Sequence, residues 1–365
     1  MTDALRLLLL GPASSIHLRR WAAGLHARGH AVCVLSQHPC DAALLPAGVE
    51  RAWLPVRGGA GYVLNAPAVR RFARRWGADV VHVHYASGYG TLASLARVGP
   101  TLLSVWGSDV YAFPEQGWLQ GRLLRWNLRR AGAIASTSRA MAARVRELTP
   151  ERREIAVTPF GVDLDAFVPA EDRPAGGLVL GTVKSLAPTY GIDLLLQAFA
   201  GLCADPQVPA DCRLLVVGDG PQRAELAALA ERLGIAARTE FAGAVAHAEV
   251  PAWLRRLDVY AAPSRAESFG VAVIEASACG RPVVVSDAGG LPEVVRDGET
   301  GRIVPVGDVA ALQAALKALA LDAPLRARLG RQGRAFVARE YAWPACLERM
   351  EDAYRKLLSS TRPPS

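Results

Sequence analysis

The sequence predicts an α/β protein with two doubly wound domains in succession, and three observations lead to this prediction. The chain has 365 residues, which is more than one hydrophobic core usually holds. Short apolar runs rich in β-branched residues alternate with longer amphipathic stretches, as strands and helices do in parallel α/β sheets. This alternation stops once, over 167–177, where prolines and glycines remove any periodicity, and then resumes.

The strands of the first domain are predicted from short apolar runs. The run at 80–83 appears buried on both sides, which is typical of a parallel sheet covered by helices on both faces. Helical periodicity between the runs is found at 17–28 and 66–76. The expected strands cover 5–11, 30–36, 79–84, 101–106 and 132–138.

The second half of the chain repeats this pattern. Its expected strands cover 178–183, 213–218, 238–243, 259–263, 282–286 and 301–306. We therefore predict a first domain at 1–168 and a second domain at 178–342. A C-terminal helix within 343–365 is expected to cross back to the first domain and to end in a disordered tail. Such domains bind ligands at the carboxyl ends of their strands, so two facing domains predict a site in a cleft between them.

Composition restricts the cellular setting and the class of partner. No apolar run reaches the roughly 18 residues that a membrane span needs. The six cysteines lack zinc-site spacing, so we expect a reduced, cytoplasmic protein, with the inner face of the cytoplasmic membrane as an open alternative. The net charge of +8 favours anionic partners such as phosphates and lipid headgroups. Without a zinc-finger or RNA-recognition signature, we expect no nucleic acid.

Two predicted helices combine arginines with aromatic residues. Four arginines flank Phe72 and Trp76, and four more flank Trp118 and Trp126. A basic and aromatic helix can lie on an anionic membrane surface, which would suit a lipid-linked substrate. The alternative, a solvated helix surface, stays open. The arginines are Arg70, Arg71, Arg74, Arg75, Arg122, Arg125, Arg129 and Arg130.

The segment 262–290 is the most informative part of the chain for chemistry. A predicted strand leads into a polar loop with Glu267, and a helix begins after Gly270. First-turn amide groups of a helix favour an anion, and a glycine lets that anion approach the backbone closely. Glu267 and Glu275 offer carboxylate acceptors for sugar and ribose hydroxyls. The Gly289-Gly290 turn adds backbone donors, so the segment suits a diphosphate sugar.

This segment resembles the E-x7-E motif of glycosyltransferase family 4, whose members are retaining enzymes of the GT-B fold. The two glutamates are Glu267 and Glu275, and the flanks Pro263-Ser264, Gly280-x-Pro282-Val283 and Gly289-Gly290-x-Pro292-Glu293 are similar too. The resemblance covers most of the chain. In the first half, Asp79-Val80-Val81-His82-x-His84 and Pro159-x-Gly161-Val162-Asp163 look like family landmarks.

The resemblance implies a nucleotide-diphosphate sugar as donor, bound by the second domain at 178–342, and an acceptor bound by the first domain at 1–168. It also assigns roles by position. Glu275 is expected to hold the ribose hydroxyls, and Glu267 the transferred sugar. Contacts to sugar and phosphate are expected from Ser268, Phe269, Gly270 and Val271. The base is expected to be bordered by Gly243, Ala244 and Val245.

One departure from the family concerns cations after the first strand of the second domain. Family members usually carry an Arg and a Lys there, which neutralise the leaving diphosphate. This chain offers only Lys184 at that place. We expect Lys184 to contact the phosphates, against the alternative of a solvated loop lysine. A second cation would have to come from Arg265, Arg19 or Arg20.

A second departure lies in the first domain, where the family often has a His-Gly pair. This chain has Trp106-Gly107. Trp106 either stacks on a sugar or packs in the core, and Asp109 either orients an acceptor hydroxyl or caps the next helix. With Glu267 and Lys184, these two residues complete our set of catalytic candidates.

Other strand ends of the first domain are candidates for the acceptor side of the cleft. Ser14 and Ser15 either line the cleft or cap the following helix, and whether His17 reaches the cleft stays open. We expect His82 and His84 to point to opposite faces of their strand, with His84 reaching the cleft.

The resemblance implies transfer with retained anomeric configuration by front-face displacement. We identify no Asp-x-Asp metal site, so we expect neither a metal nor a cofactor. A UDP-linked hexose or N-acetylhexosamine is favoured as donor, followed by GDP-mannose, with a lipid-linked or cell-surface glycan as acceptor. Two alternatives stay open: a nucleotide-sugar epimerase of the same fold, and a non-catalytic nucleotide-sugar-binding partner in a glycan-assembly complex.

Overall fold

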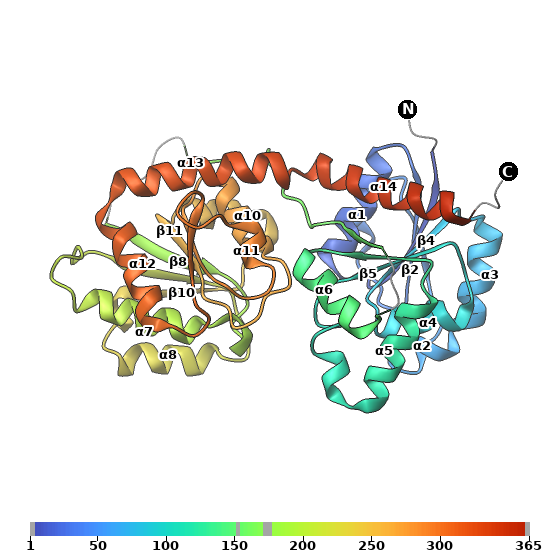
Figure 1. Cartoon of the computed structure of the whole chain (residues 1–365), viewed down its shortest axis with the longest axis horizontal. Coiled ribbons are helices and arrows are strands. Elements are labelled where there is room, and N and C mark those ends of the chain that lie inside the picture. Colours follow the sequence, from blue (N-terminus) through green and yellow to red (C-terminus); the bar gives the residue numbers. More distant parts are fainter. Residues whose placement is uncertain (1–3, 151–153, 171–176, 362–365) are drawn as a thin grey trace. The chain divides into compact units, whose positions relative to one another are not determined.

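The computed structural model describes residues 4–150, 154–170 and 177–361, which divide into two compact units (Figure 1). The described residues up to 160 and from 344 onward form the first unit, and those between 161 and 343 form the second. Within the described ranges, no helix combines the length and the apolar character required to cross a bilayer.

The described part of the first unit contains a seven-stranded sheet in the order β3-β2-β1-β4-β5-β6-β7, with every pair of neighbours parallel. The order reverses between β1 and β4, which makes the sheet doubly wound, as predicted. The central strands β4 and β5 are buried along their whole length. The strands are β1 (Arg6–Leu10), β2 (Ala31–Ser36), β3 (Glu50–Trp53), β4 (Val80–His84), β5 (Thr101–Val105), β6 (Ala133–Ser136) and β7 (Ile155–Val157).

Two of these strands were not predicted from the sequence. Most residues of β3 are exposed, and β7 has only three residues. Both lie at the edges of the sheet. A short or solvated edge strand does not need a continuous apolar run, so apolar periodicity does not reveal it.

One face of this sheet is covered by α3, α4, α5 and α6, whose apolar side chains share one core with β1, β2, β4, β5 and β6. Each helix contributes fully buried residues, for example Val69 from α3 and Leu124 from α5. The helices of the unit are α1 (Ile16–Ala27), α2 (Gly61–Leu64), α3 (Ala66–Trp76), α4 (Gly88–Ala96), α5 (Trp118–Arg130), α6 (Arg139–Leu148) and, at the C-terminus, α14 (Trp343–Thr361).

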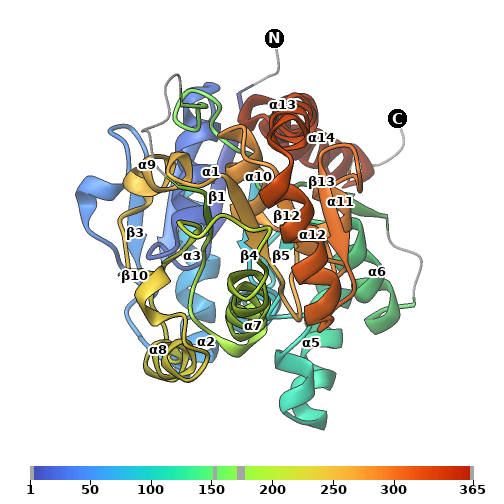
Figure 2. The same ribbon diagram turned by 90° about the vertical axis from the view of Figure 1, so that its left-hand side faces the viewer.

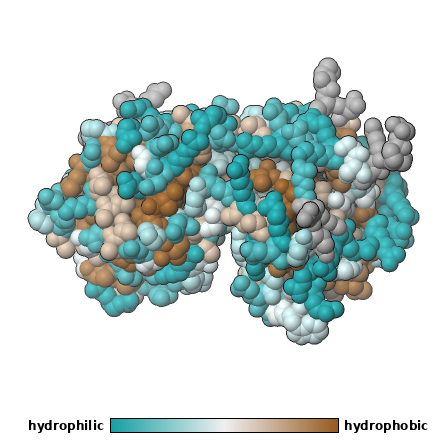
Figure 3. Space-filling view, in the orientation of Figure 1, coloured by the Kyte–Doolittle hydropathy of each residue, from teal (hydrophilic) through white to brown (hydrophobic). Residues whose placement is uncertain are grey.

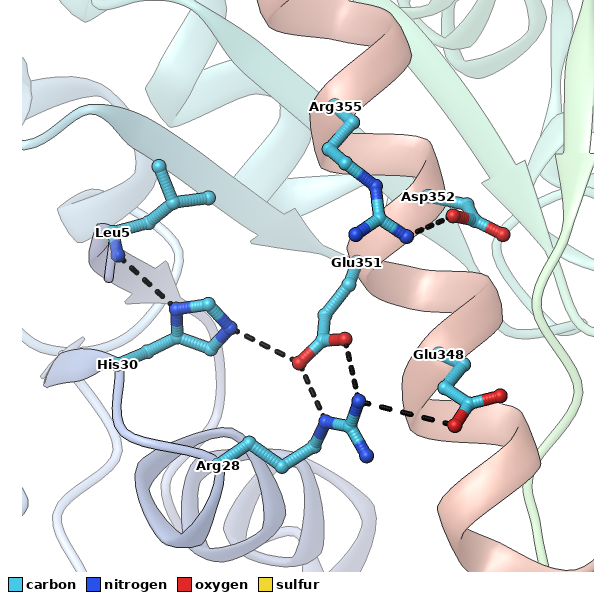
Figure 4. Close-up of polar contacts among 7 residues, drawn as sticks. All are labelled: Leu5, Arg28, His30, Glu348, Glu351, Asp352 and Arg355. Atoms are coloured by element: carbon cyan, nitrogen blue, oxygen red, sulfur yellow. Dashed lines mark hydrogen bonds and ion pairs between the residues drawn. The ribbon is translucent and has the colours of Figure 1, made fainter. Parts of the chain in front are cut away.

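The helix α14 is held in the first unit by buried polar contacts (Figure 4). Arg28 donates to both carboxylate oxygens of Glu351 over 2.6 and 2.9 Å, and His30 Nε2 lies 3.1 Å from Glu351 Oε1. Because His30 Nδ1 accepts the N–H of Leu5, Nε2 carries the proton and donates to Glu351. Burial acts to raise the pKa of Glu351, but the hydrogen bonds from Arg28 and His30 outweigh it and leave that pKa below its usual value.

The described part of the second unit contains a six-stranded parallel sheet in the order β10-β9-β8-β11-β12-β13. The order reverses between β8 and β11, and each strand coincides with one predicted from the sequence. The strands are β8 (Val179–Val183), β9 (Arg213–Val217), β10 (Thr239–Gly243), β11 (Val259–Ala262), β12 (Val283–Ser286) and β13 (Gly301–Val304).

Helices α7, α8 and α12 pack on one face of this second sheet (Figures 1 and 2). Their fully buried residues, such as Leu195 of α7 and Leu316 of α12, share one core with alternate residues of the strands. The helices of the unit are α7 (Ile192–Cys203), α8 (Arg223–Arg232), α9 (Val250–Arg255), α10 (Val271–Ala278), α11 (Leu291–Val294), α12 (Val309–Leu321) and α13 (Ala323–Glu340).

Candidate functional site

The point where the strand order of the second unit reverses lies between β8 and β11, which are hydrogen-bonded neighbours. Open α/β sheets bind ligands outside the carboxyl ends of their strands at such a point. Lys184 directly follows β8, and the loop with Glu267 follows β11. The topology therefore brings these two candidates, which are 83 residues apart in the chain, to the same edge of the sheet.

Lys184 and Glu267 form a close ion pair. Lys184 Nζ lies 2.5 Å from Glu267 Oε2, and the two side chains are only 15% and 11% exposed. The ring of Tyr190 lies 4.4 Å from Nζ, a cation–π contact. Burial acts to lower the pKa of Lys184, but the charge of Glu267, with smaller contributions from Tyr260 and Tyr190, raises it above its usual value. Lys184 is therefore a cation at neutral pH.

Glycines hold the backbone around this pair in a tight arrangement. Gly289 has a φ of +50°, and a Cβ there would lie 2.0 Å from the carbonyl oxygen of Glu267. Gly290 donates its N–H to the same oxygen over 2.9 Å. Gly218, with a φ of +134°, leaves similarly little room beside the carbonyl of Lys184. The loops that carry the ion pair therefore depend on residues without side chains.

The helix α10 begins at Val271 after Gly270, which has a φ of +110°. The N–H of Val273 donates to the carbonyl of Gly270 over 3.0 Å, whereas the N–H groups of Val271 and Ala272 precede the first bond of the helix. These two N–H groups and the helix dipole favour an anion at this end. Ser268 and Phe269 lie in the loop just before, and the Phe269 ring packs edge-on against Tyr341. The geometry therefore places backbone donors a few residues after Glu267 in the same loop.

Glu275 lies in α10 and is buried, with 5% of its surface exposed. His247 Nε2 lies 3.1 Å from Glu275 Oε1, and the ring of Phe167 lies 5.9 Å from that of His247. Sequence reasoning did not identify His247. The only signal was its position four residues after β10, just beyond the stretch predicted to border the base.

The residues predicted to border the base follow the same edge of the sheet. Gly243 is the last residue of β10 and has a φ of +81°. Its carbonyl accepts the N–H of Gly218 over 2.8 Å. Ala244 is exposed and Val245 half-buried, so both remain accessible in this unit.

Two of the three proposed sources of a second cation, Arg265 and Arg19, form hydrogen bonds to other groups. Arg265 donates to both carboxylate oxygens of Asp193 over 2.8 and 2.6 Å, and to the carbonyl of Pro188. Arg19 donates to the carbonyls of Ala13 and Ser14. Arg265 pairs with Asp193 and not with Glu267 or Glu275 among the described residues, and a phosphate role for Arg265, Arg19 or Arg20 stays a prediction.

The chain contains one Asp-x-Asp triplet. It is Asp163-Leu164-Asp165. The first carboxylate accepts the backbone N–H groups of Asp165 and Ala166, which is the arrangement of an Asx turn. Among the described residues, no group of three potential metal ligands is found.

In the first unit, the predicted residues gather around Trp106 at the carboxyl ends of β1, β4 and β5. The Trp106 ring lies 5.8 Å from His17, 5.2 Å from His84 and 5.7 Å from Phe160, and His17 stacks on Phe160 at 4.1 Å. Trp106 is half-buried in this aromatic cluster. Part of its side chain therefore packs against the other aromatic rings, and part is accessible to solvent.

The expectation that His82 and His84 point to opposite faces was wrong. Their rings lie 3.9 Å apart, because residues two apart in a strand share a face. His82 Nδ1 lies 2.7 Å from the Tyr354 hydroxyl and Nε2 lies 2.7 Å from the Ser104 hydroxyl. Both ring nitrogens of His84 are buried without a hydrogen-bond partner among the described residues. Burial lowers the pKa of His82 to about 3 and that of His84 well below its usual value, so both are neutral.

Asp109 has a position that we did not foresee. Its carboxylate is buried and accepts the backbone N–H groups of Ala86, Trp106 and Gly107 over 2.8 to 3.1 Å. It therefore ties together the loops after β4 and β5. Ser15 is the N-cap residue of α1 by position, but its side chain makes no capping hydrogen bond.

The two halves of the chain match two family descriptions. Residues 6–138 match "Glycosyl transferase 4-like", and residues 165–336 match "Glycosyl transferases group 1". The phosphatidyl-myo-inositol mannosyltransferase of Mycobacterium leprae is 32% identical over 363 residues, which cover 94% of this chain and 93% of that protein.

Solved structures show the same fold. The sucrose-phosphate synthase of Thermosynechococcus elongatus has a TM-score of 0.83 at 23% identity, covering 97% of this chain and 99% of that one. HepE of Anabaena, in complex with UDP-glucose, has a TM-score of 0.79 at 20% identity, covering 96% and 100%. Because these matches extend over both units, the chain belongs to glycosyltransferase family 4 and is a glycosyltransferase of the GT-B fold.

Proposed function

We propose that this glycosyltransferase moves a hexose or N-acetylhexosamine from a nucleotide-diphosphate sugar to a hydroxyl of a lipid-linked or cell-surface glycan, with retention of the anomeric configuration. The observation that carries the proposal is the buried Lys184–Glu267 pair at the point where the strand order reverses. In the same unit, α10 presents its N-terminus next to the Glu267 loop and carries Glu275.

Each part of a donor has a partner of suitable chemistry in this unit. The diphosphate is attracted by the cationic Lys184 and by the first-turn N–H groups of α10. In the proposed complex, Glu275 accepts hydrogen bonds from the ribose hydroxyls, and Glu267 accepts them from hydroxyls of the sugar. Gly243, Ala244 and Val245 border the base. No metal is required in this scheme, because Lys184 and the helix dipole supply the positive charge.

The transfer step is a front-face displacement. The bond between the anomeric carbon and the diphosphate oxygen breaks, and a bond forms from the acceptor hydroxyl oxygen to the same face of that carbon. The hydroxyl proton passes to the departing phosphate oxygen. The role of the protein is to orient the two reactants and to stabilise the leaving charge through Lys184.

The donor base is the least constrained part of the proposal. UDP-sugars are favoured, and the structural neighbour HepE was solved with UDP-glucose. GDP-mannose comes next, and the Mycobacterium leprae relative is named a mannosyltransferase. That name also supports a lipid-linked acceptor, which would place the enzyme at the cytoplasmic face of a membrane.

A donor panel tests the proposal directly. The thermal midpoint would be measured with UDP-, GDP- and ADP-sugars and with the free diphosphates, for the wild type, Glu275→Ala and Glu299→Ala. Glu299 is exposed in the same unit and serves as the control. We expect one base to raise the midpoint of the wild type and of Glu299→Ala, but not of Glu275→Ala, because a ligand stabilises the state that binds it.

Turnover separates the enzyme from a binding protein. Release of the free nucleotide diphosphate with an acceptor extract would be followed for the same three proteins. Stabilisation without any release would replace the proposal by a non-catalytic nucleotide-sugar-binding protein. Full activity of Glu275→Ala would remove Glu275 from the donor site.

A further inference from the structure

The outer surface of α3, α4 and α5 in the first unit has one sign of charge. These three helices and the short α2 contain no Asp or Glu. Every arginine of α3 is exposed, and so are most of those of α5. We call this surface the arginine face; its charged residues are Arg70, Arg71, Arg74, Arg75, Arg97, Arg122, Arg125, Arg129 and Arg130.

The fold gathers these arginines although they come from separate stretches of sequence. Helix α4 contacts both α3 and α5, and all three cover the same face of the sheet through one core. The cations therefore lie on one side of the unit, where Figure 3 shows hydrophilic residues over α3 and α5 as they are placed in Figure 1.

The positive charge of α3 is not neutralised by the carboxylates of the described residues. None of the four arginines of α3 forms an ion pair with a described carboxylate. Arg70 and Arg74, like Arg71 and Arg75, are four residues apart on the helix, where like charges repel each other. An external anion would relieve this repulsion.

Two hollows lie along α3 on this face. One, of about 610 Å³, is lined by the four arginines of α3 and by apolar residues that include Pro67 and Leu95. The other, of about 270 Å³, is lined by Arg70, Arg74 and Arg97. Arg70 and Arg74 thus line both hollows. In each hollow, guanidinium groups can bind the phosphate of an anionic headgroup, and the apolar or glycine residues beside them can contact its neighbouring carbon atoms.

Large apolar side chains are exposed on the same helices. Trp118 is 71% exposed and Leu119 60% at the start of α5, and Leu64 is 62% exposed in α2. A nucleic acid would leave these side chains in water. A bilayer surface takes up both kinds of group, because its phosphates attract arginines while tryptophan and leucine enter the interface.

We propose that the arginine face docks the enzyme on an anionic lipid bilayer, with lipid phosphates seated between Arg70, Arg74 and Arg97. This inference rests on the proposed function in one respect: it explains how a lipid-linked acceptor is reached. The binding itself requires neither donor nor acceptor, so it is tested separately.

Flotation with lipid vesicles tests the docking. The full chain would be mixed with vesicles of equal parts phosphatidylglycerol and phosphatidylcholine, or of phosphatidylcholine alone. We expect binding to the anionic vesicles only, and a steep loss as salt rises. The variant R70Q/R71Q/R74Q/R75Q should lose more than tenfold in affinity, since each arginine near such a surface contributes roughly fivefold.

A charge-matched variant controls for net charge. R213Q/R232Q/R328Q/R331Q removes four exposed arginines from the second unit and should bind like the wild type. In Trp118→Ser, binding should weaken at high salt as well, because an apolar contact is lost. The thermal midpoint and the donor-induced shift of each variant would show that it remains folded.

Three results would overturn the inference. They are equal loss of binding in both arginine variants, binding to phosphatidylcholine as strong as to the anionic vesicles, and binding to an RNA oligomer but not to vesicles. None of them affects the donor panel, so a failure of docking and a failure of the proposed function are distinguishable.

Discussion

At the scale of single residues, the charges of Lys184 and Glu267 stabilise each other in a place that would otherwise disfavour both. Their side chains are largely withdrawn from water, and the pKa of Lys184 is raised mainly because the charge of the carboxylate outweighs the effect of burial. A donor diphosphate next to Lys184 would provide a second anion. Under the proposed function, the pair would keep the cation charged and oriented before the donor arrives.

Substituting Lys184→Ala tests this role. We expect turnover to fall by about 100-fold or more, as when one preorganised charge is removed from a transition state. Stability should fall by about 3 kcal/mol, because Glu267 is left buried and unpaired. Steady-state kinetics and thermal unfolding measure the two effects, with Lys184→Arg expected to retain part of the activity.

The matched control is Lys317→Ala. Lys317 also pairs with a carboxylate, that of Asp205, but it lies on α12. It should lose little turnover. Unchanged turnover in Lys184→Ala would move the phosphate cation to another residue.

At the scale of elements, the turn at Gly289 determines where the Glu267 loop can lie. A Cβ at Gly289 would lie 2.0 Å from the backbone carbonyl oxygen of Glu267, and backbone cannot rotate away as a side chain can. The turn and the loop after β11 therefore fit together only with glycine at this position.

Gly289→Ala is expected to abolish the donor-induced thermal shift and to lower the thermal midpoint by several degrees. Gly298→Ala is the control, because Gly298 also has a positive φ, +74°, but nothing lies within 4 Å of a Cβ there. It should cost about 1 kcal/mol from backbone strain alone and should leave donor binding intact. Equal effects of both substitutions would contradict the clash as the cause.

The helix α14 depends on one buried carboxylate in a similar way. Glu351 accepts from Arg28 and His30, whereas Glu348 is 63% exposed and lies 4.0 Å from Arg28. We expect Glu351→Gln to cost about 2 kcal/mol and to speed hydrogen exchange in α14. Glu348→Gln should be nearly neutral, because exposed pairs contribute little. Similar exchange in both variants would contradict the assignment.

At the scale of the whole molecule, buried titratable groups make the stability of the first unit depend on pH. His82 and His84 have folded pKa values far below the usual 6.5, so the fold favours their neutral forms. Their contribution is complete above about pH 6.5 and is lost as the pH falls below that value, where the unfolded chain binds protons that the folded chain does not. The pKa of Glu351 in the folded chain is also lowered, so its contribution to stability is lost as the pH falls below about 4.5.

Unfolding measured between pH 7.5 and 5 tests this expectation. The slope should be of the order of 1 kcal/mol per pH unit for each buried histidine. His82→Gln should flatten it. Hydrogen exchange at β4 would assign the loss to the first unit, and a stability independent of pH over this range would show that both histidines titrate normally.

The sequence by itself determined the two-domain α/β organisation and most of the sheet strands, because a strand of a covered parallel sheet must be apolar on both faces. It also identified the segment that is predicted to bind the donor, since the glutamates, the glycines and the helix start lie within 262–290. The strand patterns and this motif are each formed by residues close together in the sequence, so the periodicity and spacing of residues are enough to predict them.

Only the tertiary structure decided the contacts between distant residues. It paired Lys184 with Glu267 and His247 with Glu275. It also brought the rings of His82 and His84 to 3.9 Å from each other, with His82 hydrogen-bonded to Tyr354. It also gathered the arginines of α3 and α5 on one surface and added the edge strands β3 and β7. The physical reason is that such contacts depend on strand order and crossover geometry, which bring together residues far apart in sequence without any local pattern in the chain.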